Sequence, residues 1–134
     1  MTGTPHPLPS VIGRTERALS AVLLDALGGT PVAGGDEWVA LNALAGGTDD
    51  PAAAVAAALQ GSPGQARAAL EALHGKGLVT GDGHLTDDGR AALAQVRSRI
   101  APRTHLLVEG LPEADLATAV RVLDTVRERA TRTG

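Results

Sequence analysis

The stretch S-P-G-Q-A-R-A-A-L-E-A-L-H-G-K-G-L-V, residues 62–79, decides the fold of this chain. Ser62 stands before a proline, and a capping hydroxyl followed by proline at the first helical position predicts a helix start. One face of the helix is expected to pack inward, because apolar residues recur at three- and four-residue spacing: Ala66, Ala69, Leu70 and Leu73. We expect this helix over residues 63–74.

A second short helix precedes it and begins in nearly the same way. Asp50 and Pro51 open a segment that is expected to be helical over residues 51–60. Only Gly61 and Ser62 separate the two helices, so they must turn sharply against each other. The connection length therefore predicts a helix-turn-helix.

The residues that follow predict a very small β-hairpin. Residues 78–80 and 84–86 are short extended segments on either side of Gly81-Asp82-Gly83, and an Asp-Gly turn between such segments is typical of a hairpin. Thr86 is then expected to cap another helix, because acidic residues occupy its first turn. Pro102 lies inside this helix and should kink or interrupt it.

The two ends of the chain predict long amphipathic helices. Residues 1–9 contain three prolines and are expected to form a flexible arm. Dimerisation helices are expected over about 10–28, with Ser10 as cap and Gly28-Gly29 as stop, and over about 103–131. Their apolar faces exceed what a small domain can cover, which predicts a two-fold homodimer. The faces comprise Leu19, Val22, Leu23 and Ala26, then Leu106, Leu107 and Val108, and finally Leu116, Val120, Leu123 and Val126.

The expected fold is therefore mainly α with a small β-hairpin. Asp36 is expected to cap a further helix that carries Trp38, so that a winged helix-turn-helix occupies about residues 36–90 between the terminal helices. Residues 10–134 form a single domain in this interpretation.

Four stretches of the chain resemble the MarR family of bacterial transcription regulators. They are 37–44, 62–79, 85–90 and 110–116. In that order they are similar to the family's tryptophan-bearing second helix, its recognition helix ending in L-x-x-x-G-L-V, its L-T-x-x-G segment after the wing, and its G-L-P-E-x-D segment before the last helix. The resemblance covers nearly the whole chain. It implies a homodimer that binds palindromic DNA and responds to a small ligand.

The chain departs from the family pattern at the surface that would face DNA. The family's wing is longer and carries an arginine that enters the minor groove, whereas residues 80–84 hold no arginine. Ala68 and Ala72 stand where relatives commonly carry arginine or another polar residue. We therefore expect a small minor-groove contribution.

Candidate DNA contacts lie on the outer face of the recognition helix. Gln65 suits adenine and Arg67 suits guanine or phosphate, while Ser62 and the free N–H groups at the helix start can hold a phosphate. In the alternative interpretation Gln65 and Arg67 are ordinary solvated positions and Ser62 is only a cap. The candidate DNA-binding set is Ser62, Gly64, Gln65, Arg67, Ala68, Lys76 and His84.

Charge limits the expected affinity for DNA. The whole chain has a net charge of -3, and residues 62–90 hold three basic residues against four acids. Affinity for DNA depends heavily on neutralising phosphates with lysine and arginine, so binding should be weak unless other arginines contribute. The candidates for that are Arg14, Arg17, Arg97, Arg99 and Arg103, and their alternative role is a solvated face.

A ligand pocket is a further expectation of the resemblance. Trp38, Arg14 and His105 are candidates for its wall, although the chain's single aromatic residue is first of all expected to pack in the core. No cofactor and no metal are expected, because Asp82, Asp87 and Asp88 have structural explanations in the turn and the helix start. No nucleophile motif supports an enzyme.

Composition excludes several other classes of protein. The chain has no cysteine, which removes disulfides and thiolate sites, and one aromatic residue cannot build a stacking platform for single-stranded nucleic acid. No window is long and apolar enough for a membrane helix, so a cytoplasmic protein is expected. Two functions remain: a dimeric, ligand-responsive DNA-binding regulator, or a diverged dimer that has lost operator binding and serves as a ligand-binding or protein-interaction module.

Overall fold

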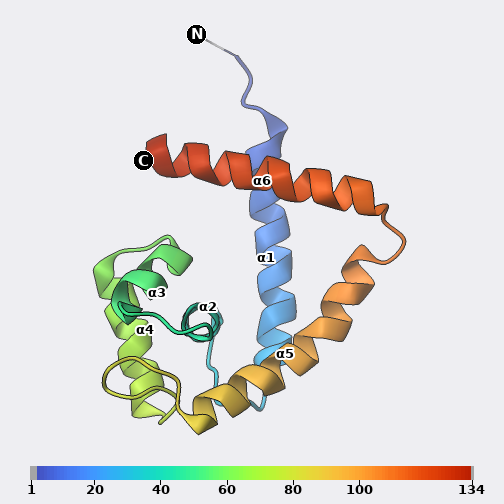
Figure 1. Ribbon diagram of the computed structural model, residues 1–134. Helices are drawn as coiled ribbons and strands as arrows, with labels where there is room; N and C mark the ends of the chain where they lie inside the picture. The colour runs from blue at the N-terminus through green and yellow to red at the C-terminus, as the bar shows by residue number, and fades with distance from the viewer. Residues whose placement is uncertain (1–2, 134) are drawn as a thin grey trace. The chain divides into compact units, whose positions relative to one another are not determined.

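The computed structural model describes residues 3–133, so residues 1, 2 and 134 of the expected arm and domain lie outside the described residues. This part of the chain is mainly α-helical, as expected, and divides into two compact units, one extending to Pro102 and one beginning at Arg103 (Figure 1). None of its helices is both long and apolar enough to span a bilayer. The helices are α1 (Pro7–Leu27), α2 (Gly35–Leu44), α3 (Pro51–Leu59), α4 (Pro63–Gly75), α5 (Asp87–Val108) and α6 (Glu113–Thr133).

Helix α1 begins earlier than the sequence predicts. The imidazole Nδ1 of His6 accepts a hydrogen bond from the backbone N–H of Leu8 at 3.1 Å, so His6 caps the helix and Ser10 lies within it. Proline is tolerated at Pro7 because the N–H groups of a first turn have no helical partner. The arm expected over residues 1–9 is therefore wrong from Pro7 onward. The stop at Gly28-Gly29 is confirmed, and Gly29 takes a φ of 78°.

Helix α2 has a different start from the expected one. Gly34 is its N-cap, and no side chain caps the first turn, so the expected cap at Asp36 is wrong. Asp36 and Glu37 instead lie within the first turn, where a carboxylate is favoured by the helix dipole. Glu37 also accepts a hydrogen bond from the backbone N–H of Ala33 at 3.0 Å, which closes the loop before α2.

The helix-turn-helix forms as the sequence predicts. Asp50 Oδ1 accepts the backbone N–H of Ala53 at 3.2 Å and caps α3. The short connection to α4 is possible because Gln60 adopts a left-handed conformation with a φ of 53°. Helices α2, α3 and α4 all pack against one another, and α1 packs against α2 (Figure 1).

The expected β-hairpin is reduced to a single antiparallel bridge between Val79 and Leu85 within the described residues. The backbone N–H of Thr80 donates to the carbonyl oxygen of His84 at 2.7 Å, and Gly83 N–H closes the turn on the carbonyl of Thr80 at 2.9 Å. Beyond this pair the chain enters α5 at once, so each side is too short to extend the pairing into a ladder. The wing is a tight turn rather than a two-stranded element.

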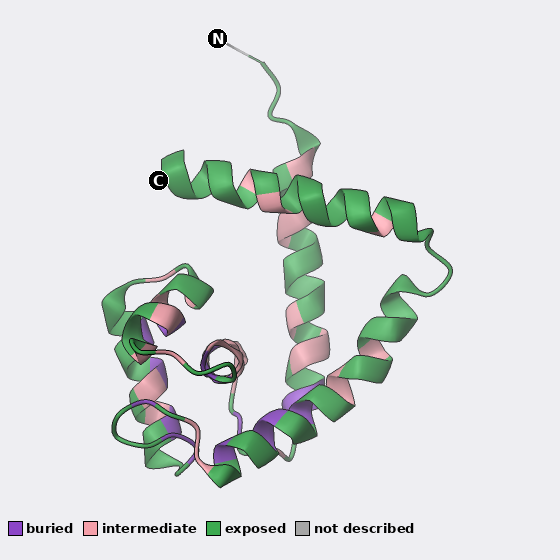
Figure 2. Cartoon of the chain, in the orientation of Figure 1, coloured by how far each residue is buried: buried purple, intermediate pink, exposed green. Residues whose placement is uncertain are grey.

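The hydrophobic core lies in the first unit. Buried side chains come from α1 to α5 and from the bridge residues, and Figure 2 shows them gathered on α2–α4 and on the first half of α5. Leu41, Val55 and Leu73 are fully buried at its centre. The predicted inner face of α5 is confirmed, with Ala92, Leu93 and Val96 buried and Ile100 packed against the cluster. Alanine at many contact positions allows the helix backbones to approach closely.

Helix α5 lies in direct contact with the turn. Gly89 in its first turn is buried, and a Cβ there would overlap the carbonyl oxygen of Leu78. Thr86 caps the helix by accepting the backbone N–H of Gly89 at 3.0 Å, and its hydroxyl donates to the carbonyl of Gly77 at 2.7 Å. The predicted cap at Thr86 is confirmed.

Helix α5 continues through Pro102 to Val108, so the proline does not interrupt the helix, and the kink expected as the alternative stays a prediction. The second unit begins beside that proline and contains the end of α5 and all of α6. The expected helix over 103–131 is therefore two helical segments, joined by a turn in which Gly110 has a φ of 82°. None of the described residues of α6 is buried.

We expect Gly89→Ala to lower the free energy of unfolding by about 1–3 kcal/mol, because its methyl group would meet backbone that cannot give way. Gly75→Ala is the matched control, since a Cβ at Gly75 meets no atom within 4 Å. Urea denaturation of the three proteins at equal concentration measures the difference. Equal stability of Gly89→Ala and the wild type would contradict this packing.

Candidate nucleic-acid interface

The start of α4 is held by a reciprocal pair of hydrogen bonds between side chain and backbone. Ser62 Oγ accepts the backbone N–H of Gln65 at 3.2 Å, and Gln65 Oε1 accepts the backbone N–H of Ser62 at 2.9 Å. This capping box satisfies two N–H groups that a helix start leaves without partners. Ser62 and Gln65 therefore have a structural role whether or not they contact DNA.

The two faces of α4 are divided as the sequence predicts. Ala66, Ala69 and Leu73 are buried against the core, and Leu70 is half-buried. The outer positions are all exposed: Ser62, Gly64, Gln65, Arg67, Ala68 and Glu71. A row of small and polar side chains on an exposed helix is the shape that a major groove admits.

The basic residues of this surface differ in their surroundings. Lys76 Nζ lies 2.6 Å from Glu37 Oε1, in an ion pair that joins the end of α4 to the start of α2. Arg90 pairs with Asp87 at 2.6 Å and donates to the carbonyl of Leu85 at 3.3 Å. Arg67 has no hydrogen-bond or ion-pair partner among residues 3–133. Within residues 62–90 it is therefore the one guanidinium or ammonium group left unengaged by the described side chains.

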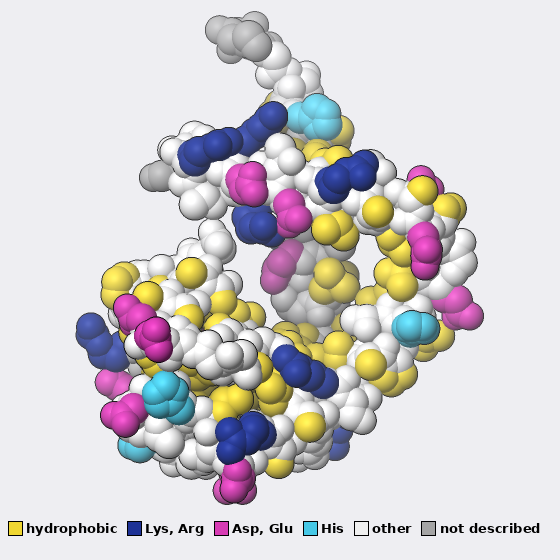
Figure 3. All heavy atoms as spheres, in the orientation of Figure 1, with side chains coloured by type: hydrophobic (Ala, Val, Ile, Leu, Met, Phe, Trp, Pro, Cys, Tyr) yellow, Lys and Arg dark blue, Asp and Glu magenta, His cyan; other side chains and the backbone are white. Residues whose placement is uncertain are grey.

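Two arginines that were candidates for extra phosphate contacts are engaged inside the first unit. Arg97 donates to the side-chain oxygen of Asn42 at 2.9 Å. Arg99 donates to the carbonyl of Gly28, and to that of Ala26 at 3.4 Å, and so satisfies acceptors that the end of α1 leaves open. Arg14 and Arg17 are exposed on α1. On the face shown in Figure 3, acidic side chains lie among the basic ones.

The turn that replaces the wing packs against α3. Gly83 is buried with a φ of 86°, and a Cβ there would lie 2.7 Å from Pro51 Cβ. The candidate DNA contact His84 is exposed, as is Asp82 at the tip of the turn. No described group of three or more His, Cys, Asp or Glu side chains is arranged to hold a metal ion.

The residues expected to line a ligand pocket fall in different units. Trp38 is half-buried and packs against the core cluster, and Arg14 is exposed in the same unit. His105 is exposed and belongs to the second unit. A pocket formed by these three residues stays a prediction.

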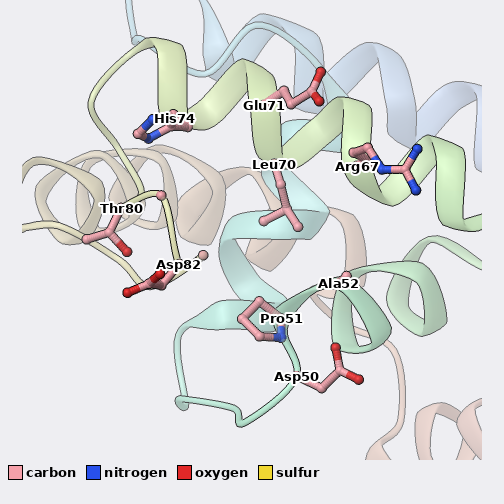
Figure 4. A pocket seen from close by; sticks show the side chains of 11 residues that line it. Asp50, Pro51, Ala52, Arg67, Leu70, Glu71, His74, Thr80 and Asp82 are labelled. Carbon is pink, nitrogen blue, oxygen red and sulfur yellow. The ribbon is translucent and has the colours of Figure 1, made fainter.

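A different pocket, which the sequence analysis missed, lies beside α4. Its volume is about 340 Å³, and it is bounded by the start of α3, one side of α4 and the turn at residues 80–83 (Figure 4). Arg67, Glu71 and His74 line it from α4, at the four- and three-residue spacing of one helical face. The sequence shows that Arg67, Glu71 and His74 share one face of a helix. It does not show that Pro51 lies against Gly83, which is the contact that closes one side of the pocket.

With this geometry in place, solved structures provide a comparison. The crystal structure of a MarR-family transcriptional regulator from Rhodococcus sp. RHA1 is similar to this chain, with a TM-score of 0.74 and 18% sequence identity, over 94% of this chain and 98% of that one. A structure of a protein of unknown function from Listeria innocua Clip11262 has a TM-score of 0.68 and 14% identity, over 91% of each chain. No protein-family model and no curated protein matches the sequence.

These likenesses show the fold. The chain has the MarR-like winged-helix fold that the sequence resemblance implies. The tight turn between Val79 and Leu85 lies where the sequence predicts the wing.

We expect Ser62→Ala to lower the free energy of unfolding by about 1 kcal/mol, because it removes one half of the capping box. Ser98→Ala, an exposed serine on α5, is the control. A double-mutant cycle of Ser62→Ala with Gln65→Ala, measured by chemical denaturation, should show that the two changes are not additive. Strict additivity would contradict the reciprocal pair.

Proposed function

We propose that this protein is a homodimeric DNA-binding transcriptional regulator that reads duplex DNA with α4. The observation that carries the proposal is the exposed row on α4 in a MarR-like fold, with Arg67 free to contact DNA and Gln65 beside the capped helix start. Arginine suits guanine and glutamine suits adenine in the major groove. Gln65 Oε1 is engaged by the cap, which leaves its amide N–H groups as donors to a base or phosphate.

The proposed interface depends on the major groove. The turn at residues 80–84 is short, has no arginine and packs against Pro51, so it supplies little to the minor groove. Lys76 and Arg90 are held in ion pairs, and each would have to exchange a carboxylate for a phosphate to contribute. Arg67 therefore carries the largest share of the electrostatic contact in each half-site.

The same ion pairs favour a second candidate function. If the engaged cations stay with Glu37 and Asp87, the surface of residues 62–90 keeps its excess of acid, and the chain is a dimer that binds a small ligand or another protein instead of DNA. The two functions differ in whether Arg67 binds duplex DNA.

Arg67→Ala is expected to weaken binding to a duplex from the protein's own upstream region by about tenfold, or about 1.4 kcal/mol, which lies within the range of about 1–3 kcal/mol for a lost base contact. Fluorescence anisotropy over a salt series of about 50 to 200 mM measures it, since phosphate-dominated binding changes steeply in that range. Arg90→Ala is the matched control, because Arg90 is already paired with Asp87 and should cost much less. A scrambled duplex of equal length controls for sequence.

Absence of saturable binding at the lowest salt would reject the DNA-binding proposal in favour of the second candidate. Equal losses in Arg67→Ala and Arg90→Ala would reject the assignment of Arg67 as the leading contact.

The proposed dimer is supported by apolar side chains that the described chain leaves exposed. On α6, Val120 is 60% exposed and Leu123 is 43% exposed, and at the end of α5 Leu106 is 72% exposed. Figure 3 shows such side chains at the surface. A helix of 21 residues without a buried side chain gains little from packing within one chain, so a second copy of the chain is the proposed cover.

Light scattering at micromolar concentration should give twice the 13.5 kDa mass of the chain. Leu123→Glu should shift the protein toward the monomer, because it places a charge on the apolar face of α6. Thr125→Glu adds the same charge two residues along, on an exposed polar position, and should leave the dimer intact. A monomeric wild type would contradict the proposal.

A further inference from the structure

We infer that the pocket between α3, α4 and the turn is a binding site for a small aliphatic diamine, and that its occupancy strengthens binding to DNA. The pocket belongs entirely to the first unit and has a volume of about 340 Å³, which lies at the lower end of the range for small-molecule sites. The inference about the ligand stands on the pocket alone. The inference about DNA rests on the proposed function.

The middle of the pocket is apolar. In Figure 4, Leu70 projects from α4 toward Pro51 at the start of α3, with Asp82 and Asp50 on either side of that proline, while the carboxylate of Glu71 points away from Leu70. The backbone of Gly81 and Gly83 forms the side nearest the turn. This surface suits a short chain of methylene groups, which gains by leaving water.

Three of the six polar side chains that line the pocket are carboxylates, which only accept hydrogen bonds when ionised. Asp50, Glu71 and Asp82 supply carboxylates, against the one guanidinium of Arg67. His74 also lines the pocket, and its Nδ1 lies 3.1 Å from the carbonyl oxygen of Val79. A carbonyl can only accept, so Nδ1 carries the hydrogen in this contact.

These two features define the class of ligand. A lining rich in acceptors requires a ligand rich in donors, and an ammonium group offers three donors and no acceptor. The charged side chains of the lining sum to a net charge of -2, counting Asp, Glu and Arg, so two ammonium groups balance them. An apolar centre between charged ends therefore fits a short α,ω-diamine better than a monoamine, a sugar or an anion.

Occupancy would change the surface that the recognition helix presents. Residues 62–90 hold three basic residues against four acids, and a bound dication turns that deficit into an excess. Glu71 lies on the exposed side of α4 one turn from Arg67, so neutralising it also removes a repulsive charge from the path of a phosphate. The diamine is therefore expected to raise the affinity of the protein for DNA, and DNA should in turn raise the affinity of the protein for the diamine.

The first test measures binding without DNA. 1,4-Diaminobutane titrated into the full-length 15N-labelled protein should give saturable NMR shifts at the turn and the adjoining part of α4, while neutral 1,4-butanediol should not. Glu71→Gln and Asp82→Asn should each weaken binding about two- to fivefold, the effect of one exposed ion pair. Asp88→Asn is the matched control, because it removes the same charge from an exposed site outside the pocket.

Shifts that do not saturate, that butanediol reproduces, or that Asp88→Asn weakens as much as the two pocket variants would overturn the site. Glu71 and Asp82 are exposed, so both variants are expected to fold.

The second test adds duplex DNA at constant ionic strength. 1,4-Diaminobutane should raise the DNA affinity of the wild type and of Asp88→Asn, and should not raise that of the Glu71→Gln/Asp82→Asn double variant. A loss of affinity in the wild type alone would overturn the expected direction of coupling. Saturable diamine binding together with absent DNA binding would reject the proposed regulator and leave the diamine site standing.

Discussion

The close contact between Gly89 and the carbonyl of Leu78 is the constraint on which the rest of the winged unit depends. It allows the first turn of α5 to lie directly on the backbone that leaves α4. Thr86 holds the two segments together, since its N–H donates to the carbonyl of Leu78, its hydroxyl donates to the carbonyl of Gly77, and its Oγ1 accepts the N–H of Gly89. The end of α4, the turn and the start of α5 therefore form one rigid corner. The turn at residues 80–84 is short because α5 begins at that corner, and residues 80–83 of the turn form one side of the pocket beside α4.

The distribution of charge follows from how this small core is held together. A domain with much alanine and one aromatic side chain has little apolar surface with which to fix its helix ends. Polar contacts take that role: Lys76 joins α4 to α2, Arg97 reaches Asn42, and Arg99 closes the end of α1. A cation used in this way can contact a phosphate only if its contact within the protein is first broken. In the proposed dimer, recognition of DNA by such a surface would come from a few well-placed contacts repeated by symmetry, because a general positive field is missing.

Local signals in the sequence identified most of the helices, and the misses have physical causes. Ser62, Asp50 and Thr86 were recognised as caps because each precedes a helix start with a proline or an acidic residue beside it. The sequence does not indicate His6 as the cap of α1, because histidine is an uncommon capping residue. Asp36 is not the predicted cap of α2, because a carboxylate is as favourable inside the first turn as before it. The Asp-Gly turn predicts the hairpin, but the length of its pairing depends on where α5 begins.

For the candidate interface, the spacing of apolar residues along the sequence is enough to distinguish the inner from the outer face of α4. The ion pair of Lys76 with Glu37 joins residues 39 positions apart, and no local pattern indicates such a contact.

The single indole of Trp38 has a practical consequence for spectroscopy. The chain has no tyrosine and no phenylalanine, so one half-buried side chain of α2, packed against the core cluster, is the source of its near-ultraviolet absorbance and its intrinsic emission. An unfolding curve followed by tryptophan fluorescence therefore reports the loss of order around α2. Far-ultraviolet circular dichroism follows all the helices at once. A difference between the two curves would measure directly how far the two units melt as separate bodies.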